Sequence, residues 1–358
     1  MAVQTWQAAV VIVLLVAVGI AVAGVTQVTG AATAGSAPVK IGIITDLTGP
    51  AAYWGESTQI GAQIAERELA GEGKPVKLLF EDYKLEPKEA VTAARKLVSV
   101  DGVDALYVEF NPATVPVAAA VKDAGIPYVL DSAAVSVVNT SNLAFKTYYD
   151  YEASCKAVAE RFKQDGIAKI SVLKPNIEFG ERCANGVKAI YPDAIIEPYN
   201  VGEPEVRTQM LKLSAAGAGA VVHGGFEPET LSALKTIREN GLAIKYATLD
   251  DFTSSPAFRQ YAPELEGGYI FGFRPVTPDF KAKVDAYGKK LSTYNGAALA
   301  YIHVKQLAYA IYECDREPAC VSRQLSQSPA DATIGFQKFE GRIARFEMQV
   351  TPGSQLAG

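Results

Sequence analysis

The side chains best suited to chemistry in this sequence stand where predicted strands end. Tyr53 and Trp54 follow an apolar run at residues 41–44, and Asp250 and Asp251 follow another at 244–249. Ligands of open α/β sheets bind outside the carboxyl ends of the strands. The candidate set joins aromatic rings to a few polar groups: Tyr53, Trp54, Asn111, Ser132, Phe179, Phe226 and Asp250. Such a composition is typical of a cleft for a small organic ligand.

Each candidate also has a simpler interpretation when it is taken alone. Trp54 could pack over the start of a helix, and Phe179 or Phe226 could be an ordinary core residue. Asp250 could cap a helix or remain solvated. Only the joint placement of these residues after strands favours a ligand site.

Signatures of catalysis and of metal binding are scarce. The sequence has no G-x-S-x-G elbow, no Walker A motif and no C-x-x-C pair, and its two histidines are His223 and His303. The glycines of "GAGAVVHGG" precede a predicted strand, so they do not open a dinucleotide-binding helix. We therefore expect no metal, no cofactor and no enzyme. An enzyme stays a further alternative, because a fold does not define a function.

The composition bounds the class of protein. The chain has 358 residues, of which 49% are hydrophobic and 20% are charged, and its net charge is −5. This length favours two domains. The acidic balance, without a basic cluster, makes nucleic acid an improbable partner.

The N-terminus carries an apolar run at residues 8–25, followed by a stretch of small and polar residues. Residues 1–37 are predicted to be a signal peptide or an uncleaved membrane anchor, because the run is nearly long enough to span a bilayer and no Lys or Arg precedes it. No cysteine lies directly after the run, which excludes a lipid-modified cysteine at this place. Both alternatives place the rest of the chain outside the cytoplasm, in the periplasm or on the outer face of the membrane, with membrane contact only through this segment.

Four cysteines form an even set with three possible pairings. Cys314 and Cys320 flank a short loop, and Cys155 and Cys183 lie on two predicted helices that flank one strand. We expect the pairs Cys155–Cys183 and Cys314–Cys320, in keeping with an oxidising compartment.

From residue 39 onward, short apolar strands alternate with helical periodicity, and the same rhythm restarts after residue 147. This pattern predicts two α/β domains built from right-handed βαβ units around parallel sheets. A long helical region from residue 279 to 314 and a hairpin at 334–350 complete the chain. If the long helix packs back on the first domain, both domains are discontinuous.

These motifs resemble the type I periplasmic solute-binding proteins of ABC transporters, the leucine-isoleucine-valine-binding family. The ordered series "IGIITDLTGPAAYWGES", "FEDYKLEPKEAVTAARK", "GIPYVLDSA", "FKTYYDYEASCKAVAE", "NIEFGERCANGVK" and "SPAFRQYAPELEGGY" carries the resemblance over nearly the whole chain after the leader. The resemblance implies a two-lobed type I periplasmic-binding-protein fold, with parallel sheets flanked by helices and three crossover hinge strands. Lobe 1 is expected at 38–146 plus 275–331, and lobe 2 at 147–274 plus 332–358.

The resemblance also implies roles for single residues, carried over by position. Trp54, with Tyr53 beside it, would cover the ligand from lobe 1. Asp250 would pair with a ligand ammonium. The remaining positions of the implied ligand set are Asn111, Ser132, Ala134, Tyr149, Phe179 and Phe226.

Three positions depart from the family pattern. Asn111 replaces a small hydroxyl residue and Ala134 replaces a threonine, so two donors to a ligand carboxylate are missing, and Asp131 adds negative charge where a proline is usual. An amino acid or amide-like ligand, possibly aromatic, is the first expectation, and an aromatic carboxylate is the second. The resemblance implies a monomer that delivers its ligand to an ABC permease; a ligand-sensing receptor subunit on the same fold is the alternative.

Overall fold

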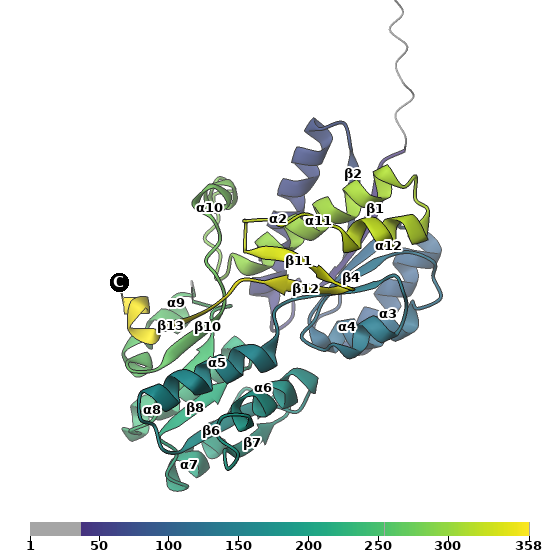
Figure 1. Ribbon diagram of the computed structural model, residues 1–358. Coiled ribbons are helices and arrows are strands. Elements are labelled where there is room, and N and C mark those ends of the chain that lie inside the picture. The colour runs from purple at the N-terminus through teal and green to yellow at the C-terminus, as the bar shows by residue number, and fades with distance from the viewer. Residues whose placement is uncertain (1–36, 254, 358) are drawn as a thin grey trace, which may run out of the picture. The chain divides into compact units, whose positions relative to one another are not determined.

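The computed structural model describes residues 37–253 and 255–357, and residues 38–358 form one compact unit (Figure 1). The predicted signal peptide or anchor lies outside the described residues, apart from Ala37. Within the described part of the chain, no helix combines the length and the apolar character needed to cross a membrane.

The first sheet holds seven strands in the order β11-β12-β5-β4-β3-β1-β2. Its strands are β1 (Val39–Thr45), β2 (Val76–Asp82), β3 (Ala105–Glu109), β4 (Tyr128–Asp131), β5 (Ala144–Thr147), β11 (Phe336–Glu340) and β12 (Ile343–Phe346). β1 to β5 are mutually parallel. β1 and β3 are almost entirely buried, which is why they read as continuous apolar runs.

The second sheet holds six strands in the order β13-β10-β9-β8-β6-β7. Its strands are β6 (Ile170–Pro175), β7 (Ile195–Tyr199), β8 (Ala220–His223), β9 (Lys245–Leu249), β10 (Tyr269–Phe273) and β13 (Met348–Pro352). β13 runs antiparallel to β10 at the edge, and the other pairings are parallel. The two sheets therefore repeat one topology, with the sequence-first strand second from the edge.

Helices flank both sheets (Figure 1). Those near the first sheet are α2 (Ala52–Gly71), α3 (Pro87–Lys96) with η1 (Leu97–Asp101), α4 (Asn111–Ala120), η2 (Ser136–Asn139), α10 (Pro278–Asp285), α11 (Asn295–Glu313) and α12 (Pro318–Ser326). Those near the second are α5 (Tyr151–Gln164), α6 (Glu178–Lys188), α7 (Arg207–Ala215), α8 (Glu227–Asn240), α9 (Pro256–Arg259), η3 (Ala262–Leu265) and η4 (Gly353–Ala357). α2 packs against α11 so closely that a Cβ at Gly61 would collide with the Ala297 carbonyl. The long helix region thus returns to the first sheet, as the sequence suggested.

The chain crosses between the sheets three times: after Thr147, between Phe273 and Pro278, and at Glu347. The third crossing differs from the sequence expectation, which assigned residues 332–358 to lobe 2. β11 and β12 belong to the first sheet, because β12 pairs in parallel with β5 at Ile343 and Lys146. The hairpin thereby covers an edge that would otherwise be unpaired, and only β13 joins the second sheet.

Both cysteine pairs agree with the expectation. Cys155 of α5 is bonded to Cys183 of α6, and Cys314 is bonded to Cys320. The first bond links the two helices that pack together beside the second sheet. The second bond closes the turn between α11 and α12.

Candidate functional site

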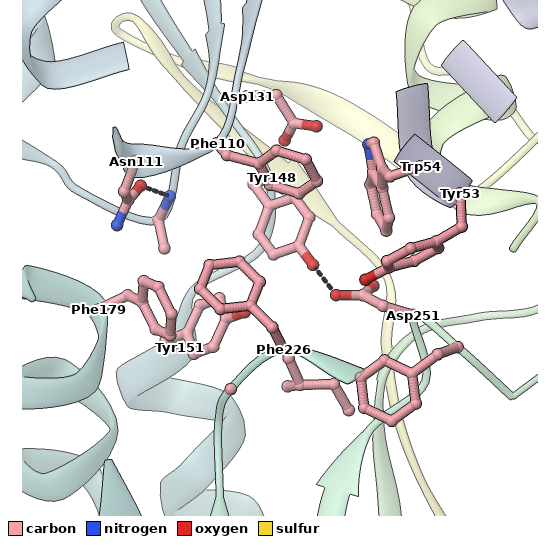
Figure 2. Close-up of a pocket in the computed structure, with 14 residues that line it drawn as sticks. Tyr53, Trp54, Phe110, Asn111, Asp131, Tyr148, Tyr151, Phe179, Phe226 and Asp251 are labelled. Carbon is pink, nitrogen blue, oxygen red and sulfur yellow. Dashed lines mark hydrogen bonds between the residues drawn. The ribbon is translucent and has the colours of Figure 1, made fainter. Parts of the chain in front are cut away.

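A pocket lies where the carboxyl ends of strands from the two sheets face each other (Figure 2). Its lining residues are Tyr53, Trp54, Phe110, Asn111, Asp131, Ala133, Tyr148, Tyr151, Phe179, Gly225, Phe226, Leu249, Asp251 and Phe252. The pocket measures about 30 Å³. Both sheets and the first crossover contribute, so the lobes stand closed on each other in this structure.

The topology explains why aromatic residues meet here. Among the parallel strands β1 to β5 of the first sheet, the topological switch point lies between β1 and β3, and in the second sheet it lies between β6 and β8. Connections leave the sheet toward opposite faces at such a switch point, which opens a crevice. Trp54 and Phe110 follow β1 and β3, and Phe179 and Phe226 follow β6 and β8.

Six aromatic rings form a closed circuit around the pocket, which we call the aromatic cage: Trp54, Phe110, Phe226, Phe179, Tyr151 and Tyr148 (Figure 2). Successive ring centroids are 5.4, 6.1, 6.0, 4.9 and 5.8 Å apart, and the circuit closes from Tyr148 to Trp54 at 6.3 Å. Phe110 and Tyr148 adopt positive φ angles of 61° and 90°. Such angles are unfavourable for bulky residues and are stabilised only by the surrounding structure.

Trp54 is fixed by a buried carboxyl group. Its indole Nε1 donates to Glu109 Oε1 at 3.1 Å, and the hydroxyl groups of Thr45 and Thr58 also donate to Glu109. Burial raises the pKa of Glu109 to about 7, against these hydrogen bonds, which lower it. Gly296 allows the arrangement, since a Cβ there would lie 2.9 Å from the indole nitrogen. The helical pattern of the sequence begins at Ser57, but α2 begins at Ala52, so that Tyr53 and Trp54 lie in its first turn.

Asn111 closes a cradle of donors at the end of β4. Its Oδ1 accepts from the Ser132 hydroxyl at 2.7 Å, from Ala133 N at 3.0 Å and from Ala134 N at 3.4 Å. Ser132 Oγ in turn accepts from Thr114 Oγ1 at 3.0 Å and from Ala134 N at 3.1 Å. The Asn111 side chain thus accepts from the Ser132 hydroxyl and the Ala134 backbone N–H, at two positions of the ligand set that the family resemblance implies.

Asp131 lies at the same strand end and is 3% exposed. Neither of its carboxyl oxygens accepts a hydrogen bond from any residue that the structure describes. The neighbouring Tyr107 hydroxyl donates to Glu109 Oε1 at 3.4 Å. Burial raises the pKa of Asp131 well above its usual range, and the charges of Glu109 and Asp251 add to this; the buried ammonium of Lys146 and the hydroxyl group of Tyr107 oppose it.

The acid that faces the pocket from the second sheet is Asp251. Asp251 lines the pocket, accepts from the Tyr148 hydroxyl, and accepts from Asn295 Nδ2 at 3.2 Å (Figure 2). Burial raises the pKa of Asp251 to about 6. Asp250, the expected acid, does not line the pocket: its carboxyl group lies against Gly272, and Asn295 Nδ2 donates to it at 3.2 Å.

Five of the expected ligand residues line the pocket, namely Tyr53, Trp54, Asn111, Phe179 and Phe226. Ser132 and Ala134 lie behind Asn111, and Tyr149 stacks on Tyr148 at 4.4 Å outside the lining. The pocket is also lined by residues that the expected ligand set did not include: Phe110, Ala133, Tyr148, Tyr151, Gly225, Leu249, Asp251 and Phe252. Most of these are chain neighbours of chosen residues, so the pocket lies at the strand ends that the sequence marked, while the directions of the side chains could not be predicted.

A contact across the cleft joins the lobes outside the pocket. Glu178, in the first turn of α6, accepts from Val135 N at 2.9 Å and from Ser136 Oγ at 2.7 Å. Val135 and Ser136 lie beside the first sheet, next to the Asn111 cradle. We call this contact the Glu178 latch.

Catalytic and metal chemistry find little support in the described residues. Within them, no three His, Cys, Asp or Glu side chains group closely enough to hold a metal ion. His223 bonds to Tyr199 and Tyr246, and His303 to Thr147 and Gln306; burial lowers the pKa of both rings. Neither histidine lines the pocket.

A family model described as "Periplasmic binding protein" matches residues 38–350. Among curated relatives, the "Amino acid binding protein" of Pseudomonas aeruginosa is 26% identical over 350 residues, which covers 90% of this chain and 91% of the relative. The "Leucine-, isoleucine-, valine-, threonine-, and alanine-binding protein" of the same organism is 26% identical over 335 residues, covering 87% and 89%.

Solved structures share the fold at lower identity. The branched-chain amino acid transporter substrate-binding protein of Streptococcus pneumoniae, in complex with isoleucine, superposes with a TM-score of 0.75 at 18% identity, covering 89% of this chain and 97% of that one. A solute-binding protein of an ABC transporter from Rhodopseudomonas palustris, in complex with p-hydroxybenzoic acid, gives 0.76 at 19% identity, covering 88% and 92%. The likeness confirms the two-lobed type I fold.

Proposed function

Because this chain belongs to the periplasmic binding protein family, we propose that it is the solute-binding component of an ABC transporter. It captures a small organic ligand between its lobes, outside the cytoplasm, and delivers it to the permease. The observation that carries the proposal is the pocket at the two switch points, with its lining divided between the lobes. A site divided in this way is completed only when the lobes close.

Binding and closure are then one equilibrium. A ligand that contacts both lobes binds the closed form better and shifts the population toward it. The three crossovers are the segments that take up the rotation. The permease would recognise the closed form, which carries the Glu178 latch on its surface.

The ligand class follows from the pocket and from the relatives. The two Pseudomonas relatives are named for amino acids, and the aromatic cage offers apolar and planar surface. We propose a compound of amino acid or amide-like size that carries nitrogen and an apolar or aromatic body. The pocket supports binding rather than turnover, since no histidine or other paired base and nucleophile faces it.

The N-terminal segment fits this role. An apolar run that acts as a signal peptide or as an anchor would place residues 38–358 on the side of the membrane where the permease collects its cargo. The disulfides Cys155–Cys183 and Cys314–Cys320 are in keeping with that oxidising side.

Thermal unfolding of the full chain tests the proposal, with a panel of amino acids, amides, amines and aromatic acids. A ligand at one hundred times its dissociation constant stabilises the folded state by about 2.7 kcal/mol. We expect a selective shift with one group of related compounds, and its loss in a Phe226→Ala variant that still unfolds cooperatively. A flat response to the whole panel at millimolar concentration would count against the proposed ligand class.

A further inference from the structure

The donor cradle of the first lobe has no hydrogen bond left for a ligand carboxylate. Asn111 Oδ1 accepts from Ser132 Oγ, Ala133 N and Ala134 N at 2.7 to 3.4 Å. Backbone N–H groups can only donate, so the atom they meet must be the amide oxygen. A carboxylate would have to displace the Asn111 side chain before it could accept from these three donors.

Two side chains of the pocket, Asn111 and Asp131, have polar atoms without hydrogen-bond partners among the described residues, and these atoms favour a different ligand group. Both carboxyl oxygens of Asp131 and the Nδ2 of Asn111 are buried and have no hydrogen-bond partner among the described residues. Leaving such groups unpaired costs about 1–3 kcal/mol each. A ligand therefore gains most by offering N–H donors to Asp131, and secondarily an uncharged acceptor to Asn111.

The acidic side chains at the pocket carry negative charge and favour a cationic ligand group. Asp131 and Asp251 line the pocket, and Glu109 lies directly behind Trp54; the buried cation near them is Lys146, whose ammonium donates to the Tyr148 and Tyr149 carbonyls at 2.8 and 3.3 Å. Burial raises the pKa of each of these three acids. A cation beside them would offset that effect of burial.

The aromatic cage favours the same kind of ligand group. Six rings in a closed circuit line the pocket, so a head group bound there meets ring faces and edges. Aromatic cages of this kind recognise ammonium groups, because the ring quadrupole attracts a cation.

We propose that the ligand is an organic cation with N–H donors and without a free carboxylate: a primary amine, or an amino acid whose carboxylate is replaced by an amide. Its ammonium group lies in the aromatic cage against Asp131, and an amide carbonyl, where present, accepts from Asn111 Nδ2. This inference rests on the proposed function and names the head group that the same pocket takes.

Matched compounds separate the contribution of the ligand's head group to binding from that of its side chain. Alanine, leucine and phenylalanine are each compared with their amide, with the amine that lacks the carboxylate, and with the nitrogen-free acid, by calorimetric titration of the full chain. Within the series that binds, we expect the amide or the amine to bind at least roughly tenfold more tightly than the parent amino acid. The reason is that the carboxylate of the parent amino acid would be an unpaired charge in the pocket. The nitrogen-free acid should show no binding.

Two variants test the residues. Asp131→Asn keeps the shape and removes the charge, so the affinity for the amine should fall roughly 10- to 100-fold. Asn111→Ser frees the donor cradle, so the affinity for the parent amino acid should rise roughly tenfold. Asp123→Asn, an exposed acid of the same lobe, is the matched control and should change neither.

The outcomes separate this inference from the proposed function. Tighter binding of the amino acid or of the nitrogen-free acid than of the amine and amide would overturn the inference and leave the binding-protein role intact. An Asp131→Asn variant with unchanged amine affinity would likewise overturn it. No binding by any of the compounds would overturn the inference together with the proposed ligand class.

Discussion

The two lobes contribute differently to one pocket. Lobe 1 presents side chains that are held by hydrogen bonds: Trp54 by Glu109, and Asn111 by three donors at the end of β4. Lobe 2 presents mainly rings held by packing, such as Phe179 and Phe226, together with Asp251.

The difference suggests a division of work during binding. A surface fixed by buried hydrogen bonds keeps its shape when the lobes separate, because its partners lie within its own lobe. A surface of rings gains its contacts only on closure, as Phe110 and Phe226 do at 6.1 Å across the cleft. We therefore expect lobe 1 to receive the ligand and lobe 2 to complete its enclosure.

The largest expected effect is the loss of unfolding free energy when Trp54 of lobe 1 is truncated. Trp54 is fully buried, and replacing such a residue by alanine costs about 3–5 kcal/mol of unfolding free energy. Trp54→Ala should lower the free energy of unfolding by this amount, and Phe226→Ala, at a half-buried position, by less than half as much. Urea unfolding without ligand measures both.

A matched variant separates the ring from its hydrogen bond. Trp54→Phe keeps an aromatic surface and removes the donor to Glu109, which should cost about 1 kcal/mol. Equal losses of stability for the alanine variants of the two lobes would contradict the division described above.

The second prediction concerns pH and the Glu109 carboxyl group. Its pKa is about 7 in the folded state against an ordinary 4.5, so between these values the folded chain binds more protons than the unfolded chain. Stability should therefore fall as pH rises from 4.5 to 7, by up to about 3 kcal/mol from this group. Unfolding titrations at several pH values follow the decrease.

Glu109→Gln removes this group's titration while preserving its shape. Asp251, with a pKa of about 6, and Glu229, with a pKa of about 7, act in the same direction and remain, so the decrease should become shallower rather than vanish. An identical pH profile for the wild type and Glu109→Gln would show that Glu109 is already ionised without penalty.

The smallest expected effect concerns the Glu178 latch. Its two hydrogen bonds join the lobes only when they are closed, so Glu178→Ala should weaken ligand binding about fivefold, equivalent to about 1 kcal/mol. The stability of the ligand-free protein should stay nearly unchanged. Calorimetric titration with a ligand found in the panel measures the affinity.

Glu160→Ala is the control for the latch. Glu160 pairs with Lys156 along the surface of α5 at 3.8 Å and bonds to no residue of the other lobe in the described part of the chain, so its removal should leave the affinity as it is. An unchanged affinity in Glu178→Ala as well would mean that the latch does not stabilise closure.

Much of the fold could be predicted from the sequence, because strand and helix periodicities are local. The alternation after residue 39 predicted two α/β domains with parallel sheets, and two helices flanking one strand suggested the Cys155–Cys183 bond. Two features were misjudged, one local and one that joins distant parts of the chain. The first turn of α2 has no apolar periodicity to announce it, and β12 pairs with β5, almost two hundred residues away in sequence.

The site was less predictable, because adjacent residues at a strand end point in different directions. Asp250 and Asp251 differ by one position, and only the second lines the pocket, since Gly272 leaves room for the carboxyl group of the first. In the same way, the sequence showed that Asn111 replaced a hydroxyl residue. It could not show that the Asn111 amide oxygen would occupy the donors of the cradle.

The sequence by itself determined the α/β rhythm, the family and the strand ends where a ligand would be held, because these follow from local patterns and from the order of motifs. The tertiary structure decided which side chains enclose the pocket, which acid faces it and which donors are already taken. Those outcomes depend on distances between residues far apart in the chain, and side-chain direction at a strand end is set by the partners that packing brings there.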